Sequence, residues 1–168
     1  MTALVEVRPA RVRDARTIKA SIDHYAGKVV LGKELVTLYE GIQEFWVAEQ
    51  AGEIVGCGAL HVLWEDLAEI RTVAVDPMAK GRGIGHALVA RLVATAGELG
   101  LSRIFVLTFE TEFFGRHGFL PIADAPVPPD VYDEIRHSPD EGVAQFLDLA
   151  HVKPNTLGNT RMLLRLGA

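Results

Sequence analysis

The chain has 168 residues, of which 49% are hydrophobic and 23% charged, and its formal net charge is -5. These values indicate one globular domain, residues 1–168, with a core of its own, and the negative charge argues against broad nucleic-acid binding. A single cysteine excludes an internal disulfide and a cysteine-rich zinc site. No signal-peptide core is visible, and the longest stretch without Lys, Arg, Asp or Glu, residues 54–64, is too short to cross a membrane, so a cytoplasmic protein is expected.

Hydrophobic periodicity divides the chain into strands, in which apolar residues alternate, and helices, in which they recur every three to four residues. In the first half we expect a strand over 4–8, helices over 14–23 and 33–43, a hairpin of strands over 45–49 and 54–63, and a strand over 67–75. In the second half we expect a helix over 83–99, a strand over 103–108, a short helix over 110–117, extended chain over 119–122, helical pieces over 131–136 and 142–149, and a last strand over 161–166. This order indicates an α/β or α+β fold with helices on a mixed sheet.

Three details of these elements can be stated from the sequence. Leu35, Leu38 and Ile42 share one face of the second helix, and Gly100 is a suitable stop for the helix over 83–99. The apolar stripe of that helix comprises Ile84, Leu88, Leu92, Thr95, Ala96 and Leu99. Cys57 lies within an apolar run and is expected to be a buried structural thiol.

The most informative motif joins the strand over 67–75 to the helix over 83–99 and reads Lys80-Gly81-Arg82-Gly83-Ile84-Gly85-His86. A glycine-rich turn before a helix aims several backbone N–H groups at one point, where the helix dipole adds positive charge, so the point suits phosphate or pyrophosphate. A Walker A loop is excluded, and the dinucleotide fingerprint is incomplete because His86 occupies its sixth place. The alternative is an ordinary glycine-rich turn that begins a helix.

A basic residue followed by Gly83 and Gly85 resembles the acyl-CoA loop of the GNAT N-acetyltransferases. The order of elements is similar to the GNAT fold, a mixed twisted β-sheet flanked by helices, over nearly the whole chain. Residues 103–108 and 112–119 are also similar to the FVLT and WFxxxGF signature of bacterial N-acetylglutamate synthases. Many such synthases carry an amino-acid-kinase domain, for which this chain is too short, so the resemblance implies a stand-alone form.

The resemblance implies acetyl-CoA as co-substrate and no metal. Backbone N–H groups of Arg82, Gly83, Gly85 and His86 would hold the pyrophosphate, and Lys80 and Gly81 belong to the same cofactor-binding loop. Lys80 stands where the family often has Gln or Arg, a mild departure. The backbone of Val73 and Val75 would bind the pantetheine arm as an added strand, although both valines also fit a core. His86 is not expected to bind metal, because no second histidine lies at ligand spacing.

The resemblance also implies the catalytic residues. Glu69 stands where GNAT enzymes place a carboxylate near the acceptor amine, and it would take the amine proton directly or through water. The alternative is a surface glutamate paired with Arg71. Thr108 matches a hydroxyl residue that would steady the amine or the departing thiolate, or it caps the following helix. The tyrosine acid of many GNAT enzymes is absent, since Phe113 and Phe114 occupy the aromatic places.

For the acceptor, the resemblance implies L-glutamate, with N-acetylglutamate for arginine biosynthesis as the product. Two carboxylates call for two cations. Lys33 and Arg161 stand near the matching places, with Gly158 as the other alignment of the latter, and Arg71 is a further candidate. Each cation is otherwise a solvated surface charge. Other readings are an acetyltransferase for another small amine or a protein N-terminus, and a non-catalytic acyl-CoA-binding sensor; a homodimer is left open.

Overall fold

A computed structural model describes residues 3–25, 33–123, 126–147 and 159–167. Within these residues the strands form one mixed sheet in the order β1-β2-β3-β4-β5-β7-β6. The chain divides into two compact units, one of Met1–His61 with Ile70–Leu99 and one of Val62–Glu69 with Gly100–Ala168. The predicted mixed sheet with flanking helices is therefore confirmed.

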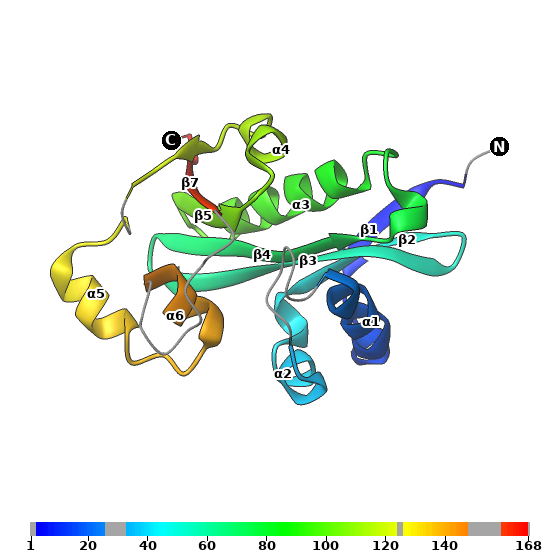
Figure 1. The fold of residues 1–168 in the computed structure, drawn as a ribbon, viewed down its shortest axis with the longest axis horizontal. Helices are drawn as coiled ribbons and strands as arrows, with labels where there is room; N and C mark the ends of the chain where they lie inside the picture. The colour runs from blue at the N-terminus through cyan, green and yellow to red at the C-terminus, as the bar shows by residue number, and fades with distance from the viewer. Residues whose placement is uncertain (1–2, 26–32, 124–125, 148–158, 168) are drawn as a thin grey trace. The chain divides into compact units, whose positions relative to one another are not determined.

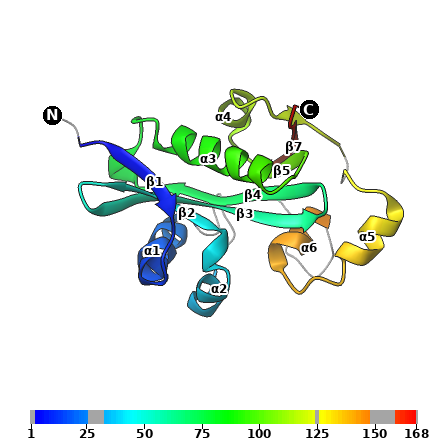
Figure 2. The same ribbon diagram turned by 180° about the vertical axis from the view of Figure 1, so that it is seen from behind.

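The first unit contains the amino-terminal elements and the longest helix. Its strands are β1 (Val5–Pro9), β2 (Phe45–Gln50), most of β3 (Glu53–Trp64) and the second part of β4 (Leu67–Val75). Its helices are α1 (Ala15–Tyr25), α2 (Leu35–Glu40) and α3 (Ile84–Glu98), with 3-10 turns at Val12–Asp14, Ile42–Glu44 and Pro77–Ala79. β2 pairs antiparallel with β1 and with β3. Figures 1 and 2 show α1 and α2 on one face of these strands and α3 on the other, so both faces are covered.

The core of the first unit agrees with the predicted helix faces, apart from the end of α3. Leu38 and Ile42 are buried, with Leu35 packed beside them. Most of the predicted α3 stripe is also buried, together with Val89. Leu99 is 60% exposed, so its assignment to the stripe is wrong. The helix stops at Glu98, and the chain turns away at Gly100, whose φ is 85°.

Two glycines of β3 let α3 approach the sheet closely. A Cβ built on Gly56 would lie 3.1 Å from side-chain atoms of Ile84 and Leu88, and one on Gly58 would lie 3.1 Å from Leu92. Such distances are tighter than nine in ten real Cβ contacts, so a larger residue here would require the α3 side chains to give way by a few tenths of an ångström. The glycines therefore set the height of α3 above the strand.

Cys57 and Thr72 lie in the interior of the first unit. Cys57 is fully buried, as predicted, and its Sγ donates to the Thr72 carbonyl at 3.6 Å. Burial raises the pKa of this thiol to about 12. Thr72 has a φ of 60°, a left-handed value that a β-branched residue rarely adopts. Such a backbone conformation costs on the order of 1–3 kcal/mol.

The second unit is built around β5 (Arg103–Thr108). This strand runs parallel to the start of β4, from Leu67–Arg103 to Glu69–Phe105, and antiparallel to β7 (Thr160–Arg165), which also pairs with β6 (Leu120–Pro121). The helices are α4 (Thr111–Gly115), α5 (Pro129–Ile135) and α6 (Glu141–Leu147). The short helix is thus shorter than the predicted 110–117, and the remaining residues turn toward Gly118, whose φ is 92°. Residues 148–149 of the last predicted helical piece lie outside the described residues.

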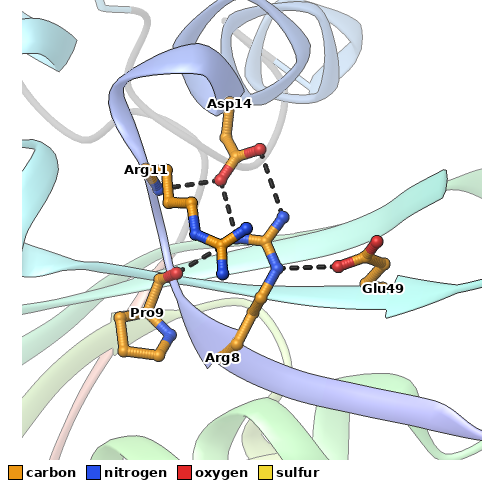
Figure 3. A network of polar contacts seen from close by, with 5 residues as sticks. All are labelled: Arg8, Pro9, Arg11, Asp14 and Glu49. Atoms are coloured by element: carbon orange, nitrogen blue, oxygen red, sulfur yellow. Dashed lines mark hydrogen bonds and ion pairs between the residues drawn. The ribbon is translucent and has the colours of Figure 1, made fainter. Parts of the chain in front are cut away.

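A largely buried ion network joins β1, the 3-10 turn that precedes α1, and β2 (Figure 3). The Arg8 guanidinium donates to Asp14 Oδ2 at 2.8 Å and to Glu49 Oε2 at 2.7 Å. The backbone N–H of Arg11 donates to the same Asp14 oxygen at 2.7 Å. Asp14 is 4% exposed, and the Arg8 hydrogen bond lowers the pKa of its carboxyl. The network therefore fixes the entry into α1 on the sheet.

Asp14→Asn should lower the free energy of unfolding at pH 7 by about 3 kcal/mol, because it leaves a buried arginine partly uncompensated. The folded-state pKa of Asp14 lies below its unfolded value of about 3.9, so the carboxylate stabilises the fold above that pH and loses this effect as the pH falls through the folded value. The stability difference between wild type and variant should therefore shrink below about pH 4. Urea unfolding across pH measures it. Asp23→Asn, which breaks the exposed pair with Lys19, is the control and should change little. A constant difference across the pH range would contradict the assignment.

Candidate functional site

The glycine-rich loop lies between the turn Pro77–Ala79 and the first turn of α3. Gly81 and Gly83 have φ values of 82° and 77°, and Gly83 is the N-cap of α3 with no side-chain cap hydrogen bond. A Cβ on either glycine would meet nothing within 4 Å, so the space beside these residues is open. The first-turn N–H groups of a helix have no partner within the helix, and the helix dipole adds positive charge there. The loop therefore fits a pyrophosphate group.

Contacts at both ends hold this loop in place. The Asp76 N–H donates to the Val55 carbonyl at 2.8 Å, and Asp76 Oδ1 accepts from the Met78 N–H at 2.9 Å. Arg82 Nη1 donates to Gln50 Oε1 at 3.0 Å, and Lys80 Nζ lies 5.0 Å from the centre of the Tyr25 ring. Both loop cations thus contact the protein around the loop. A depression of about 510 Å³ beside Arg82 contains none of the loop glycines in its lining.

In β4 next to the loop, the backbone polar groups of alternate residues point away from β3. Because Asp76 bonds to Val55 of β3, and successive strand residues point to opposite edges, the polar groups of Val73 and Val75 face the other edge. Over the described residues, the pairing of β4 with β5 covers Leu67 to Glu69 and stops short of both valines. The Val75 carbonyl accepts a hydrogen bond from the Tyr25 hydroxyl at 2.7 Å. This placement suits the predicted pantetheine contact, which stays a prediction.

Glu69 and Arg71 are both shielded from water. Glu69 is 6% exposed, so the alternative of a surface glutamate is wrong. The Arg71 side chain is 10% exposed, and its Nη2 lies 3.7 Å from Glu44 Oε2, so it is not a solvated surface charge. Glu44 Oε1 lies 2.6 Å from His61 Nδ1. Glu44 therefore bridges Arg71 and His61, a cluster that the sequence pattern does not predict. The roles of Glu69 and Arg71 remain predictions.

Thr108 has a local structural contact as well as its predicted role. Its Oγ1 accepts the Glu110 N–H at 2.8 Å, which steadies the turn into α4, although the N-cap of that helix is Glu110. A hydroxyl that accepts one bond still has a proton to donate. Phe113 and Phe114 pack with ring centres 5.0 Å apart, so the places of the usual tyrosine hold packed apolar rings.

Lys33 and Arg161 are both partly buried. Lys33 precedes α2 in the first unit, and its carbonyl accepts from Lys19 Nζ at 3.0 Å. Arg161 lies on β7 in the second unit, opposite Leu107. Gly158, the other alignment at this end, is outside the described residues, and the substrate-binding roles of both cations stay predictions.

The part of the chain that the structure describes has neither a metal-binding group nor a membrane-spanning helix. There, no three His, Cys, Asp or Glu side chains are grouped so that they could hold a metal ion. The helices in the same residues are too short or too polar to cross a membrane.

Sequence analysis misses four residues that make contacts around the site, because no local motif marks them. They are Tyr25, Gln50, Glu44 and His61.

Comparison with known proteins gives concordant matches. The model of the acetyltransferase (GNAT) family matches residues 20–119. An amino-acid acetyltransferase from Mycobacterium tuberculosis is 63% identical over 163 residues, covering 95% of this chain and 94% of that protein. The crystal structure of Rv2747 from Mycobacterium tuberculosis in complex with CoA has a TM-score of 0.94 and 62% identity, covering 96% of this chain and 99% of that chain. N-acetylglutamate synthase from Neisseria gonorrhoeae, complexed with CoA and N-acetyl-glutamate, has a TM-score of 0.78 and 27% identity, and this chain covers 36% of it.

Proposed function

Because this chain belongs to the GNAT family of acetyltransferases, we propose that it transfers the acetyl group of acetyl-CoA to the α-amine of an amino acid. We propose L-glutamate as that amino acid, which would make the product N-acetylglutamate and the step the first of arginine biosynthesis. The observation that carries the proposal is the open glycine loop at the start of α3, in a chain similar over nearly its full length to an amino-acid acetyltransferase. We also propose that residues 1–168 act as one acetyltransferase domain, since β3 and β4 run through both units.

The proposed reaction is a direct transfer in a ternary complex. Glu69 takes a proton from the α-ammonium group, directly or through water, and the neutral nitrogen attacks the thioester carbonyl carbon. A C–N bond forms, the attacking nitrogen gives up its second proton to solvent, the C–S bond breaks, and the CoA sulfur leaves with the bonding electron pair. Solvent protonates this thiolate, because the packed Phe113 and Phe114 supply no acid. The loop N–H groups hold the pyrophosphate throughout.

A thiol-release assay over a panel of amines tests the proposal. Acetyl-CoA is supplied with glutamate, glutamine, aspartate, polyamines or short peptides, and glutamate should give the highest kcat/KM. Activity on peptides alone would instead make the protein an N-terminal acetyltransferase. Binding of acetyl-CoA without thiol release from any amine would favour a sensor domain.

Lys33→Met and Arg161→Met should each raise the KM for glutamate roughly ten- to a hundredfold. Each change would remove a charge-assisted hydrogen bond to a carboxylate, which contributes about 1.5–3 kcal/mol. The KM for acetyl-CoA should change little. Arg136→Met removes an exposed cation from the end of α5 and is the matched control. Unchanged KM values for glutamate in both variants would reject these two residues and direct attention to Arg71.

A further inference from the structure

Tyr25, the last residue of α1, contacts both ends of the connection from β4 to the glycine loop. Its hydroxyl donates to the carbonyl of Val75, which closes β4, at 2.7 Å. Its ring lies 5.0 Å from Nζ of Lys80, which opens the loop. The ring of His24 stands edge-on to the same ring, with centroids 4.7 Å apart. One side chain thus joins a helix, a strand end and the loop.

The hydroxyl contact fixes one peptide unit in particular. The carbonyl of Val75 and the N–H of Asp76 belong to the same planar group. The carbonyl is held by Tyr25, and the N–H is held by the Val55 carbonyl at 2.8 Å. With both polar ends bonded, this peptide cannot rotate without breaking a contact. The direction in which the chain enters the loop is therefore set from two sides.

The ring contact restrains the cation beside the loop. A lysine side chain is flexible, and its ordering on ligand binding costs conformational entropy. An ammonium group over an aromatic face is attracted by the ring and has fewer orientations to lose. A ligand that brings negative charge to the loop then meets a partly ordered cation. Preorganisation of this kind raises affinity without adding a contact to the ligand.

We propose that Tyr25 is a positioning residue for acetyl-CoA, which orders the loop entry through Val75 and the loop cation through Lys80. This inference rests on the proposed function, since it takes the loop to be the acetyl-CoA site. Tyr25 acts on the affinity for CoA and leaves the acceptor and the chemical step to other residues. Its loss should therefore raise the Kd for CoA and the KM for acetyl-CoA, with kcat and the acceptor KM unchanged.

Calorimetric titration with CoA tests the inference on the full chain. Tyr25→Phe keeps the ring and removes the hydroxyl, and it should raise the Kd about three- to tenfold. Tyr25→Leu removes both contacts and should raise it more, roughly tenfold or above. Lys80→Met should weaken binding less in the Tyr25→Leu background than in the wild type, because the two residues act together. Tyr39→Phe, on α2, is the matched tyrosine control and should bind CoA as the wild type does.

A general loosening of α1 must give a different pattern. Ile22→Val trims a fully buried residue of the same helix and should lower the thermal midpoint while leaving the Kd unchanged. Equal weakening of CoA binding by Ile22→Val and Tyr25→Phe would overturn the positioning role. Wild-type affinity in Tyr25→Phe and Tyr25→Leu would overturn it as well, while leaving the proposed function in place. A wild-type protein that fails to bind CoA would reject the loop assignment and this inference together.

Discussion

Gly83→Asp should weaken CoA binding by at least about a hundredfold, equivalent to ~2.7 kcal/mol, while the fold stays intact. The residue caps α3 at a φ of 77° with open space around its Cα, so a carboxylate can be built there without a clash. That carboxylate would occupy the place of the pyrophosphate and repel its charge. An acidic residue at a helix N-terminus is also favourable for the helix, so loss of folding is not expected. Calorimetry with CoA, with circular dichroism of the same sample, measures both effects.

Gly100→Asp is the matched control for this change. Gly100 has a φ of 85°, and a Cβ added to it would meet nothing within 4 Å, so the control reproduces the backbone strain and the added charge. It follows α3 at the opposite end, away from the loop. Its CoA affinity should equal that of the wild type. Equal CoA affinities for Gly83→Asp and the wild type would contradict the assignment of the loop as the CoA site.

Glu69→Gln should lower kcat by roughly a hundredfold or more, because the variant keeps the shape of the side chain and loses its basicity. Glu69 is buried on β4, where a carboxylate can meet the amine out of bulk water. The affinity for acetyl-CoA should barely change, since the loop is untouched. Steady-state kinetics across the pH range, with calorimetry for CoA, separate the two quantities.

The control for Glu69 lies in the turn between β3 and β4. Glu65 is exposed, and Glu65→Gln should keep the wild-type kcat at every pH. If Glu69→Gln also turned over normally across the pH range, the carboxylate would not be the base. The buried Glu69 side chain would then have a structural role only.

The sequence is enough to predict the elements whose periodicity is strong. The length of α3 and the burial of most of its stripe follow from spacing alone. Leu99 breaks the pattern because the helix already ends at Glu98, and hydrophobic periodicity alone does not fix the last residue of a helix. The close seating of α3 on Gly56 and Gly58 is likewise invisible in a strand pattern, since it depends on side chains that lie more than 25 residues further along.

In the candidate site, too, some features can be predicted from the sequence and others cannot. The loop can be predicted because its glycines and its helix start are neighbours in the chain. The contacts that hold it cannot, since Tyr25 and Val75 are 50 residues apart, and Arg82 and Gln50 are 32 residues apart. The contact between Glu44 and His61, which are 17 residues apart, cannot be predicted for the same reason. Such pairs depend on how the sheet and helices pack, and no local signal marks them.

Because Cys57 is buried, the rate at which its thiol reacts reports how often the protein opens. Burial raises the pKa of the native thiol to about 12, so very little of it is ionised at pH 8, and the buried sulfur is shielded from reagents. Once α1 and α2 lift from this face of the sheet, the thiol is exposed, returns to an ordinary pKa of about 8.5 and reacts quickly. Because the chain has no other cysteine, each labelled molecule has opened at this one place in the sheet. Labelling therefore follows the exposure of this part of the first unit, by local or global opening, without any engineered probe.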